Sequence, residues 1–242
     1  MMSTDNPVAM LTKELTNLLS PKTVFVFDWD GTIFDSMKVK SDNFVKAFLW
    51  AISTISCSAT EKNLEYHYRR LSGRPRKEIF YEILTILGME PTSYLYDEFS
   101  RMFEKLNMTS LIHAPVFPDA LVLMNELIQR NGKIYISSSV PPNELQEIVE
   151  AVLSISIRRR VSKVLGSKDG FSKGSEHIGF IRQDCNVTNH QIIVFGDDRA
   201  DYELSADAGV DCILIDRSIN GSQQAGPIII NSFSKIKDSL AI

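Results

Sequence analysis

Cysteine is scarce in this chain of 242 residues, and its placement suggests neither a disulfide framework nor a zinc site. The three cysteines, Cys57, Cys185 and Cys212, are widely spaced and form no Cys-x-x-Cys pair. The four histidines show no metal-ligand spacing either. This usage argues against a secreted, disulfide-stapled scaffold, and we expect packed thiols in a reducing cytoplasmic protein.

Long apolar runs and an excess of basic residues are also missing. No stretch approaches the ~18 apolar residues of a membrane-spanning helix, and the N-terminus has no basic segment followed by an apolar one. A formal net charge of -4 gives no basic footprint for nucleic acid. We therefore expect neither a membrane nor a nucleic acid as partner. With 44% hydrophobic residues, the chain can form the core of one large and one small domain.

Among the features that are present, the most informative is an apolar run at residues 24–27 that leads into Asp28-Trp29-Asp30-Gly31-Thr32. A continuous apolar run is typical of a strand buried on both faces of a parallel sheet, and ligands of such sheets bind beyond the carboxyl ends of the strands. Two carboxylates at this position indicate either a chemical site or a simple turn, because Asp and Gly also favour turns.

Later segments bring further polar groups to the ends of expected strands. They are Ser138 and Ser139 after residues 133–137, Lys173 on a loop beyond residues 161–165, and Asp197, Asp198 and Asp201 after residues 191–195. Taken singly, a loop lysine is more often a solvated residue, and Ser138 fits a helix N-cap equally well. Their common position at strand ends favours a single shared site.

With these motifs the chain resembles the haloacid dehalogenase superfamily over residues 21–217, in particular its helical-cap phosphatases of the phosphoglycolate phosphatase and β-phosphoglucomutase branch. The family's DxDGT pattern matches Asp28 to Thr32, and its acidic GDxxxD pattern matches Gly196 to Asp201. Its lysine matches Lys173, and its strand-terminal Ser or Thr matches Ser138, with Ser137 as the alternative. Trp29 departs from the pattern, where a small or aliphatic residue is commoner; we expect little effect, because its side chain points away from the aspartates.

The resemblance implies a phosphoryl-transfer site. Because an attacking carboxylate is repelled by a phosphate dianion, a cation must screen the two charges, and Mg²⁺ suits oxygen ligands of this kind. The implied roles are Asp28 as nucleophile, Asp30 as general acid and base, and Ser138 and Lys173 as groups that hold the phosphoryl oxygens. Mg²⁺ is expected on the side chains of Asp28 and Asp197 and the backbone carbonyl of Asp30, with Asp198 and Asp201 orienting Lys173 or metal-bound water.

A long insertion of about 80 residues separates Ser36 from Pro115. An ordinary connection between a strand and a helix has only a few residues. Its apolar residues recur at helical spacing, which predicts a small helical bundle. We therefore expect an N-terminal extension at residues 1–20, a helical cap at 37–114, and a core at 21–36 and 115–242. The alternation of strands and helices in the core predicts an α/β fold with a Rossmann-like parallel sheet. The family resemblance implies that the first and fourth strands of this sheet are neighbours.

The cap is expected to select the substrate, since lids contact the leaving group. Its stretch at residues 71–78 gathers cations beside Gly73, and the alternatives are a solvated helix start or a site for a second anionic group. In the second interpretation, Arg76 binds that group with Arg74 or Lys77; Gly73, Lys77 and Ser139 are further expected substrate contacts. The cationic run at residues 158–160 is instead expected to be a solvated helix end.

The expected function is Mg²⁺-dependent hydrolysis of a small phosphorylated metabolite, such as a sugar phosphate or phosphoglycolate, by a monomer or homodimer. One alternative is an isomerase of the phosphoglucomutase type, in which Arg76 would hold a second phosphate. Another is a non-catalytic phosphate-binding protein on the same fold. Asp30 disfavours a carbon-halogen hydrolase, and a phosphonate hydrolase would need a cap lysine such as Lys77 to form a Schiff base.

Overall fold

The protein is described by a computed structural model that covers residues 7–55, 59–71, 74–217 and 228–240. Its centre is a six-stranded, fully parallel sheet with the strand order β3-β2-β1-β4-β5-β6. The strands are β1 (Val24–Phe27), β2 (Lys133–Ser137), β3 (Val161–Leu165), β4 (Ile192–Gly196), β5 (Asp211–Ile215) and β6 (Ile228–Ile230). The predicted parallel α/β fold is confirmed.

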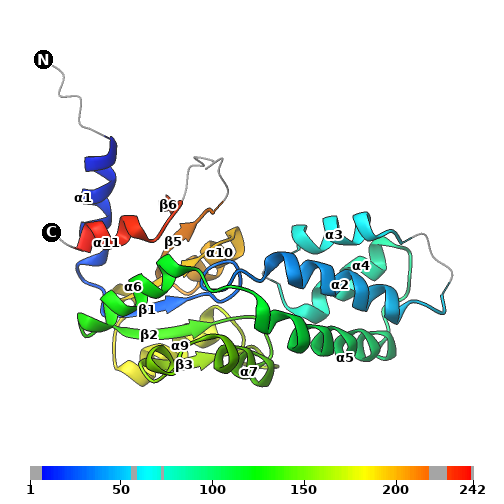
Figure 1. The fold of residues 1–242 in the computed structure, drawn as a ribbon. Helices are drawn as coiled ribbons and strands as arrows, with labels where there is room; N and C mark the ends of the chain where they lie inside the picture. The colour runs from blue at the N-terminus through cyan, green and yellow to red at the C-terminus, as the bar shows by residue number, and fades with distance from the viewer. Residues whose placement is uncertain (1–6, 56–58, 72–73, 218–227, 241–242) are drawn as a thin grey trace, which may run out of the picture.

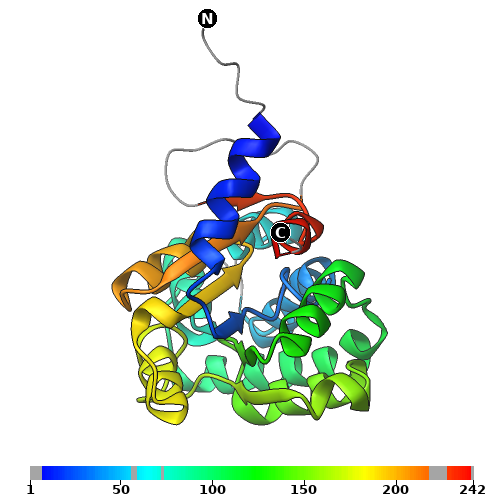
Figure 2. The same cartoon turned by 90° about the vertical axis from the view of Figure 1, so that its left-hand side faces the viewer.

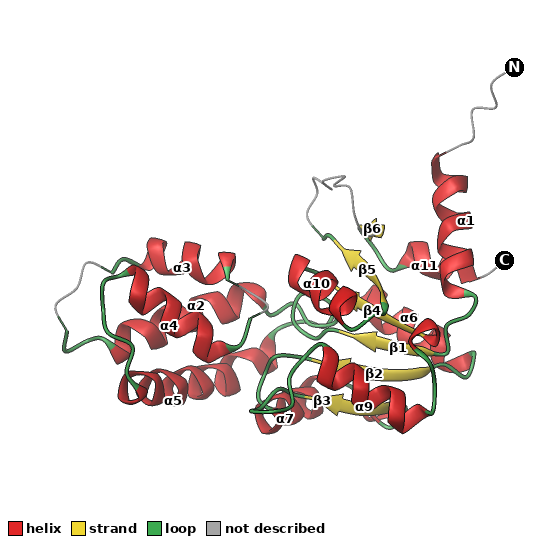
Figure 3. Cartoon of the chain, turned by 180° about the vertical axis from the view of Figure 1, so that it is seen from behind, coloured by secondary structure: helices red, strands yellow, loops and turns green. Residues whose placement is uncertain are grey.

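Helices cover both faces of this sheet, as Figure 3 shows with the yellow strands lying between red helices. They are α6 (Pro118–Gln129), α7 (Pro142–Val152), α8 (Ile155–Arg158), α9 (Ser175–Cys185), α10 (Arg199–Asp207) and α11 (Ser234–Leu240), with a short 3₁₀ turn, η2 (Asn189–Gln191). Phe25 and Phe27 of β1 pack on one face of the sheet with residues of α6, α7 and α11. Val24 and Val26 pack on the opposite face with residues of α9. The apolar run of β1 is continuous because both faces of the strand are buried.

The insertion forms a separate group of helices beside the sheet (Figure 1). It contains α2 (Met37–Ala51), α3 (Glu61–Arg70), α4 (Arg76–Ile86) and α5 (Ser93–Ser110), and the 3₁₀ turn η1 (Leu111–His113) follows. The helices share a cluster of buried aromatic residues that includes Phe44, Phe48, Phe80 and Phe99. Since α2 and α5 make the most extensive contact, the first and last helices of the insertion bring its two ends together.

Two terminal elements pack against each other. Helix α1 (Pro7–Leu19) buries Leu15 and Leu19 in the core and contacts α11, and its first turns project from the body (Figure 2). Strand β6 and helix α11 were not expected from the sequence pattern. Within the described ranges, every helix is too short or too polar to cross a membrane.

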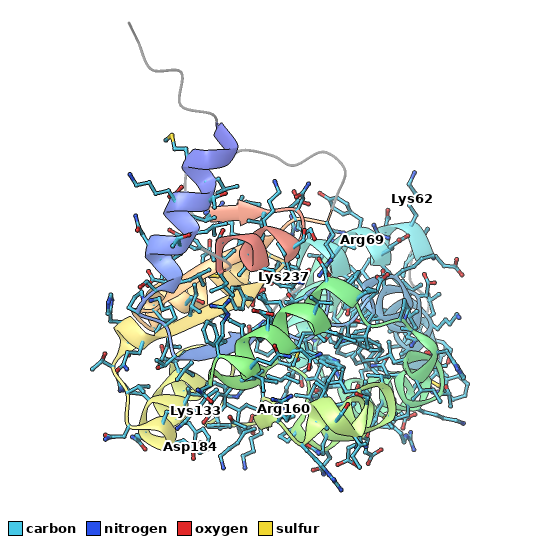
Figure 4. All side chains as sticks on the ribbon, turned by 60° about the vertical axis from the view of Figure 1, so that its left-hand side comes forward. Lys62, Arg69, Lys133, Arg160, Asp184 and Lys237 are labelled. Atoms are coloured by element: carbon cyan, nitrogen blue, oxygen red, sulfur yellow. The ribbon has the colours of Figure 1, made fainter. Side chains whose placement is uncertain are left out.

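Charged side chains are spread over the surface, and the residues Lys62, Arg69, Arg160 and Asp184, labelled in Figure 4, are exposed. The cationic run at residues 158–160 begins at the end of α8, and Arg159 and Arg160 are exposed. This placement confirms the expectation of a solvated helix end for Arg159 and Arg160, whereas Arg158 is half-buried.

Candidate active site

The site is built where β1 and β4 end side by side. The two strands pair in parallel, with Phe27 opposite Phe195, and the backbone N–H of Asp28 continues the ladder to the carbonyl of Phe195 at 2.8 Å. The predicted adjacency of the first and fourth strands is confirmed. One carboxylate oxygen each of Asp28, Asp197 and Asp201 lies within 4.8 Å of the other two.

Glycine at two positions lets these carboxylates approach the backbone. Gly31 has a positive φ of 81°, and a Cβ there would lie 2.0 Å from Oδ2 of Asp197. A Cβ at Gly196 would lie 2.3 Å from Cγ of Asp201. Because no side chain fits between these groups, the glycines of both acidic motifs are required by the packing of the site itself.

Lys173 lies among these carboxylates. Its Nζ is 2.5 Å from Oδ1 of Asp28 and 2.5 Å from Oδ1 of Asp201. The loop is tied to the end of β2, because the Lys173 backbone N–H donates to Ser167 Oγ, which in turn donates to the Ser138 carbonyl. The structure thus brings the predicted lysine to the predicted nucleophile.

Burial and neighbouring charges shift the pKa values of Asp28, Asp197 and Lys173. Burial raises the pKa of Asp28 to about 8, although Lys173 opposes the shift. Burial and the charges of Asp28 and Asp201 raise the pKa of Asp197 well above its usual value. Burial alone would lower the pKa of Lys173, but Asp201 and Asp28 raise it well above its usual value. Three carboxylates facing one ammonium leave an excess of negative charge, and their hard oxygen donors fit a divalent ion such as Mg²⁺.

Ser138 lies one residue beyond β2, with a side chain that is almost fully buried. Its Oγ accepts a hydrogen bond from the Val140 backbone N–H at 3.2 Å, which leaves the hydroxyl proton available for another acceptor. Ser137, the alternative, belongs to β2 and pairs with Nδ1 of His177 at 2.8 Å. Ser139 lines the pocket described below.

Asp30 is held by residues at the start of the insertion. Ser36 Oγ donates to its Oδ1 at 2.5 Å, and Lys40 Nζ is 2.6 Å from its Oδ2. Lys40 is only 8% exposed, and sequence reasoning missed it. A signal was present, because Lys40 precedes Phe44 by one helical turn on the face of α2 that is buried. A cation on an otherwise apolar stripe indicates a buried partner.

A pocket lies between the strand ends and the helices α2–α5. Asp28, Asp30, Lys173 and Asp197 line it from the side of the sheet. The helices contribute Lys40, Phe44, Tyr68, Arg74, Arg76 and Phe103. The pocket therefore presents a group of carboxylates on one side and a mixture of cations and aromatic rings on the other.

Of the residues of the insertion that we expected to contact the substrate, the structure places one at the pocket and one away from it. Arg76 lines the pocket, forms an ion pair with Glu144 of α7 and lies over the ring of Phe103. Lys77 is not among the described residues that line the pocket, and its Nζ lies over the rings of Tyr81 and Tyr96 instead. Gly73 lies outside the described residues.

Glu144 is a second residue that sequence reasoning did not assign to the site. Its side chain is 1% exposed, and its second oxygen accepts from Nδ2 of Asn107 at 2.9 Å. Asn107 accepts in turn from Asn43 at 3.0 Å. The buried ion pair of Arg76 and Glu144 joins α4 to the sheet side of the pocket. Because the two residues lie far apart in the sequence, no local pattern could predict this pair.

The acidic residues after β4 have different contacts. Asp201 contacts Lys173 and also accepts from the Asp197 backbone N–H at 3.1 Å. Asp198 caps α10, because its Oδ1 accepts from the backbone N–H groups of Ala200 and Asp201. The Asp198 side chain thus accepts hydrogen bonds from backbone N–H groups, whereas Asp201 belongs to the carboxylate cluster and contacts Lys173.

Arg217, beyond the end of β5, supports the turn that carries the first motif. Its guanidinium donates to the carbonyls of Gly31 and Thr32 at 3.3 and 3.0 Å and to Asp119 at 3.1 Å. It also lies 3.6 Å from the ring centroid of Phe117. Sequence reasoning missed Arg217. The one signal in the sequence is that this cation comes just after the end of a strand of the same sheet.

His177 of α9, which contacts Ser137 of β2, should make the stability of the protein depend on pH. It is fully buried, and burial lowers the pKa of its imidazole from 6.5 to about 4. An unfolded chain would protonate this residue near 6.5, so the stabilisation is complete above that pH and is lost as the pH falls towards 4. Between pH 7.5 and 5, this residue should lower the free energy of unfolding by about 2 kcal/mol, measured by urea unfolding at both pH values.

The variant His177→Asn isolates this effect, because Asp28 and Asp197 also titrate in the folded protein. We expect the stability difference between the two pH values to shrink by that amount in His177→Asn, and to stay unchanged in a control variant of the exposed His113, His113→Asn. An equal difference in His177→Asn and in the parent protein would contradict the assignment.

Comparisons with known proteins agree with this architecture. The family model of the haloacid dehalogenase-like hydrolases matches residues 25–215. A search of curated proteins found no match. The fold is similar to that of a predicted phosphoglycolate phosphatase from Haemophilus somnus, with 16% identity, a TM-score of 0.69 and coverage of 90% of this chain and 97% of the other.

Two structures of CbbY from Rhodobacter sphaeroides are also similar. The first, in complex with phosphate, is 13% identical with a TM-score of 0.70, and the match covers 91% of this chain and 100% of the other. The second, an Asp-to-Asn variant with xylulose-1,5-bisphosphate, is 14% identical with a TM-score of 0.68, covering 88% and 95%. Identities this low show a shared fold alone, whereas the family model covers most of the sequence: the chain belongs to the haloacid dehalogenase-like hydrolases.

Proposed function

We propose that the protein is a Mg²⁺-dependent phosphatase that hydrolyses a small phosphorylated metabolite through an aspartyl-phosphate intermediate. The observation that carries this proposal is the position of Asp28 at a pocket, in contact with Lys173 and within 4.8 Å of two further carboxylates. This combination of a nucleophile, a cation for the phosphoryl oxygens and oxygen ligands for an ion is what phosphoryl transfer needs.

In the proposed reaction, an oxygen of Asp28 forms a bond to phosphorus while the ester oxygen leaves with a proton from Asp30. Water then attacks the aspartyl phosphate, and Asp30 takes a proton from it, so that phosphate is released and Asp28 is restored. Lys173 and the hydroxyl of Ser138 hold the phosphoryl oxygens. The bound Mg²⁺, held by Asp28 and Asp197 with Asp201 beside them, would screen the repulsion between carboxylate and phosphate.

We further propose that the helices α2–α5 act as a cap that contacts the leaving group. Support comes from the pocket, because Lys40, Tyr68 and Arg76 line it from these helices. The mutase alternative would use Arg76 to hold a second phosphate. Glu144 already engages this guanidinium, which favours the hydrolase.

Phosphate release from a panel of phosphorylated metabolites tests the proposal. With Mg²⁺ we expect hydrolysis without any bisphosphate activator, and a chelator should lower the rate by about 100-fold or more, since the ion supplies several kcal/mol of charge stabilisation. Added Mg²⁺ should restore the rate. Undiminished activity after chelation would contradict the metal dependence, and no phosphate release from any substrate would contradict the enzymatic role.

A further inference from the structure

Each carboxylate oxygen of Asp30 has a hydrogen-bonding or charged partner in this structure. Ser36 donates to Oδ1, and the ammonium of Lys40 lies 2.6 Å from Oδ2. Both partners come from the start of the insertion, and the side chains of Lys40 and Asp30 are 11% and 16% exposed. A leaving oxygen that approaches Asp30 therefore competes with these two donors.

Release of Lys40 has a cost that depends on what replaces Asp30. A buried ammonium without a partner is strongly unfavourable, so Lys40 leaves Asp30 readily only when another anion is offered. Among the described residues that line the pocket, those from α2–α5 include no carboxylate. The nearby Glu144 is already occupied by Arg76 and Asn107. The other carboxylates that line the pocket lie on the side of the sheet, so on the side of α2–α5 the replacement anion must come with the substrate.

The surroundings of Lys40 suit such a substrate. Tyr68 and Arg76 line the same pocket as Lys40, while Phe44 and Phe103 offer apolar surface for a short carbon chain. We propose that Lys40 makes the site selective for phosphate esters whose leaving group carries an anion, which draws Lys40 away and frees Asp30. This inference rests on the proposed phosphatase function and adds the substrate class.

Three esters of one three-carbon chain test the inference: the monophosphates that end in a hydroxyl or a carboxylate, and the bisphosphate. Because a charged hydrogen bond contributes ~1.5–3 kcal/mol, we expect the parent protein to prefer the anionic esters by about 10- to 100-fold in kcat/KM. Part of this preference should lie in kcat, because the anion of the leaving group both binds Lys40 and frees Asp30. A preference for the carboxylate or for the bisphosphate supports the inference and identifies the anion.

Lys40→Met should remove the preference, so that the ratio of kcat/KM for the anionic esters to kcat/KM for the hydroxyl ester falls towards one. Lys40→Arg should retain part of it, and Lys38→Met is the matched control, because Lys38 lies on the same helix with a side chain that is 82% exposed. An equal loss for all three esters in Lys40→Met, or a preference that survives it, would overturn the inference. Failure of the parent protein to hydrolyse any of the three esters or an aryl phosphate would instead count against the proposed function.

Discussion

Asp28→Asn should abolish phosphate release, with a loss of about 10⁴-fold or more, the scale seen when a catalytic nucleophile is removed. The amide keeps the shape of the side chain but has no negative charge and no oxygen nucleophile of comparable strength. It also leaves one carboxylate fewer for an ion beside Asp197 and Asp201. Phosphate release from an aryl phosphate at saturating Mg²⁺ measures the effect.

The loss must come from chemistry rather than from unfolding. Asp28→Asn removes a buried carboxylate whose pKa is raised by burial, and Lys173 retains Asp201 as a partner, so the variant should remain folded in thermal unfolding. Asp35→Asn is the matched control, because Asp35 lies in the same segment but is exposed. It should keep activity within a few-fold. Comparable turnover in Asp28→Asn and the parent protein would reject Asp28 as nucleophile.

The parts of the site that the sequence predicts are those encoded by contiguous residues. The apolar runs before Asp28 and Asp197 predict two buried strands, and in a parallel sheet the carboxyl ends of neighbouring strands share one edge. The glycine in each acidic motif follows from the same packing, since both would clash with a carboxylate if they carried a Cβ. Local pattern and strand direction therefore predict that the carboxylates share one edge of the sheet, and the strand order implied by the family resemblance makes their strands neighbours.

Contacts between the insertion and the sheet were not predicted, because no short-range pattern encodes them. The ion pair of Arg76 and Glu144 joins two separate elements. The hydrogen bond from Arg217 to the carbonyl of Thr32 likewise depends on where β5 ends relative to β1. Strand β6 is a three-residue run, too short for a periodic signal. Arg76 also shows that residue type alone is insufficient, because a cation expected to bind a substrate anion can instead be paired with a carboxylate of the same chain.

Asp30→Asn should lower turnover by about 100- to 10,000-fold, the range that a positioned acid contributes, and the loss should depend on the leaving group. An asparagine cannot protonate the departing oxygen, so alkyl phosphates, which are poor leaving groups, should lose most. Aryl phosphates with acidic phenols should lose least in the first step, although their second step still needs a base to activate water. A plot of log kcat/KM against the pKa of the leaving alcohol measures this, and it should be steeper in the variant.

Asp30→Asn also leaves the Lys40 ammonium without its carboxylate, which separates two causes of a loss. A destabilised protein would lose activity equally for all esters, whereas a missing acid changes the slope of the plot. Since Lys40 is buried, the double variant Asp30→Asn with Lys40→Met should recover stability in thermal unfolding without recovering the rate for alkyl esters. An unchanged slope in Asp30→Asn would show that Asp30 does not act as the acid, and Lys40 would then have no proton donor to control.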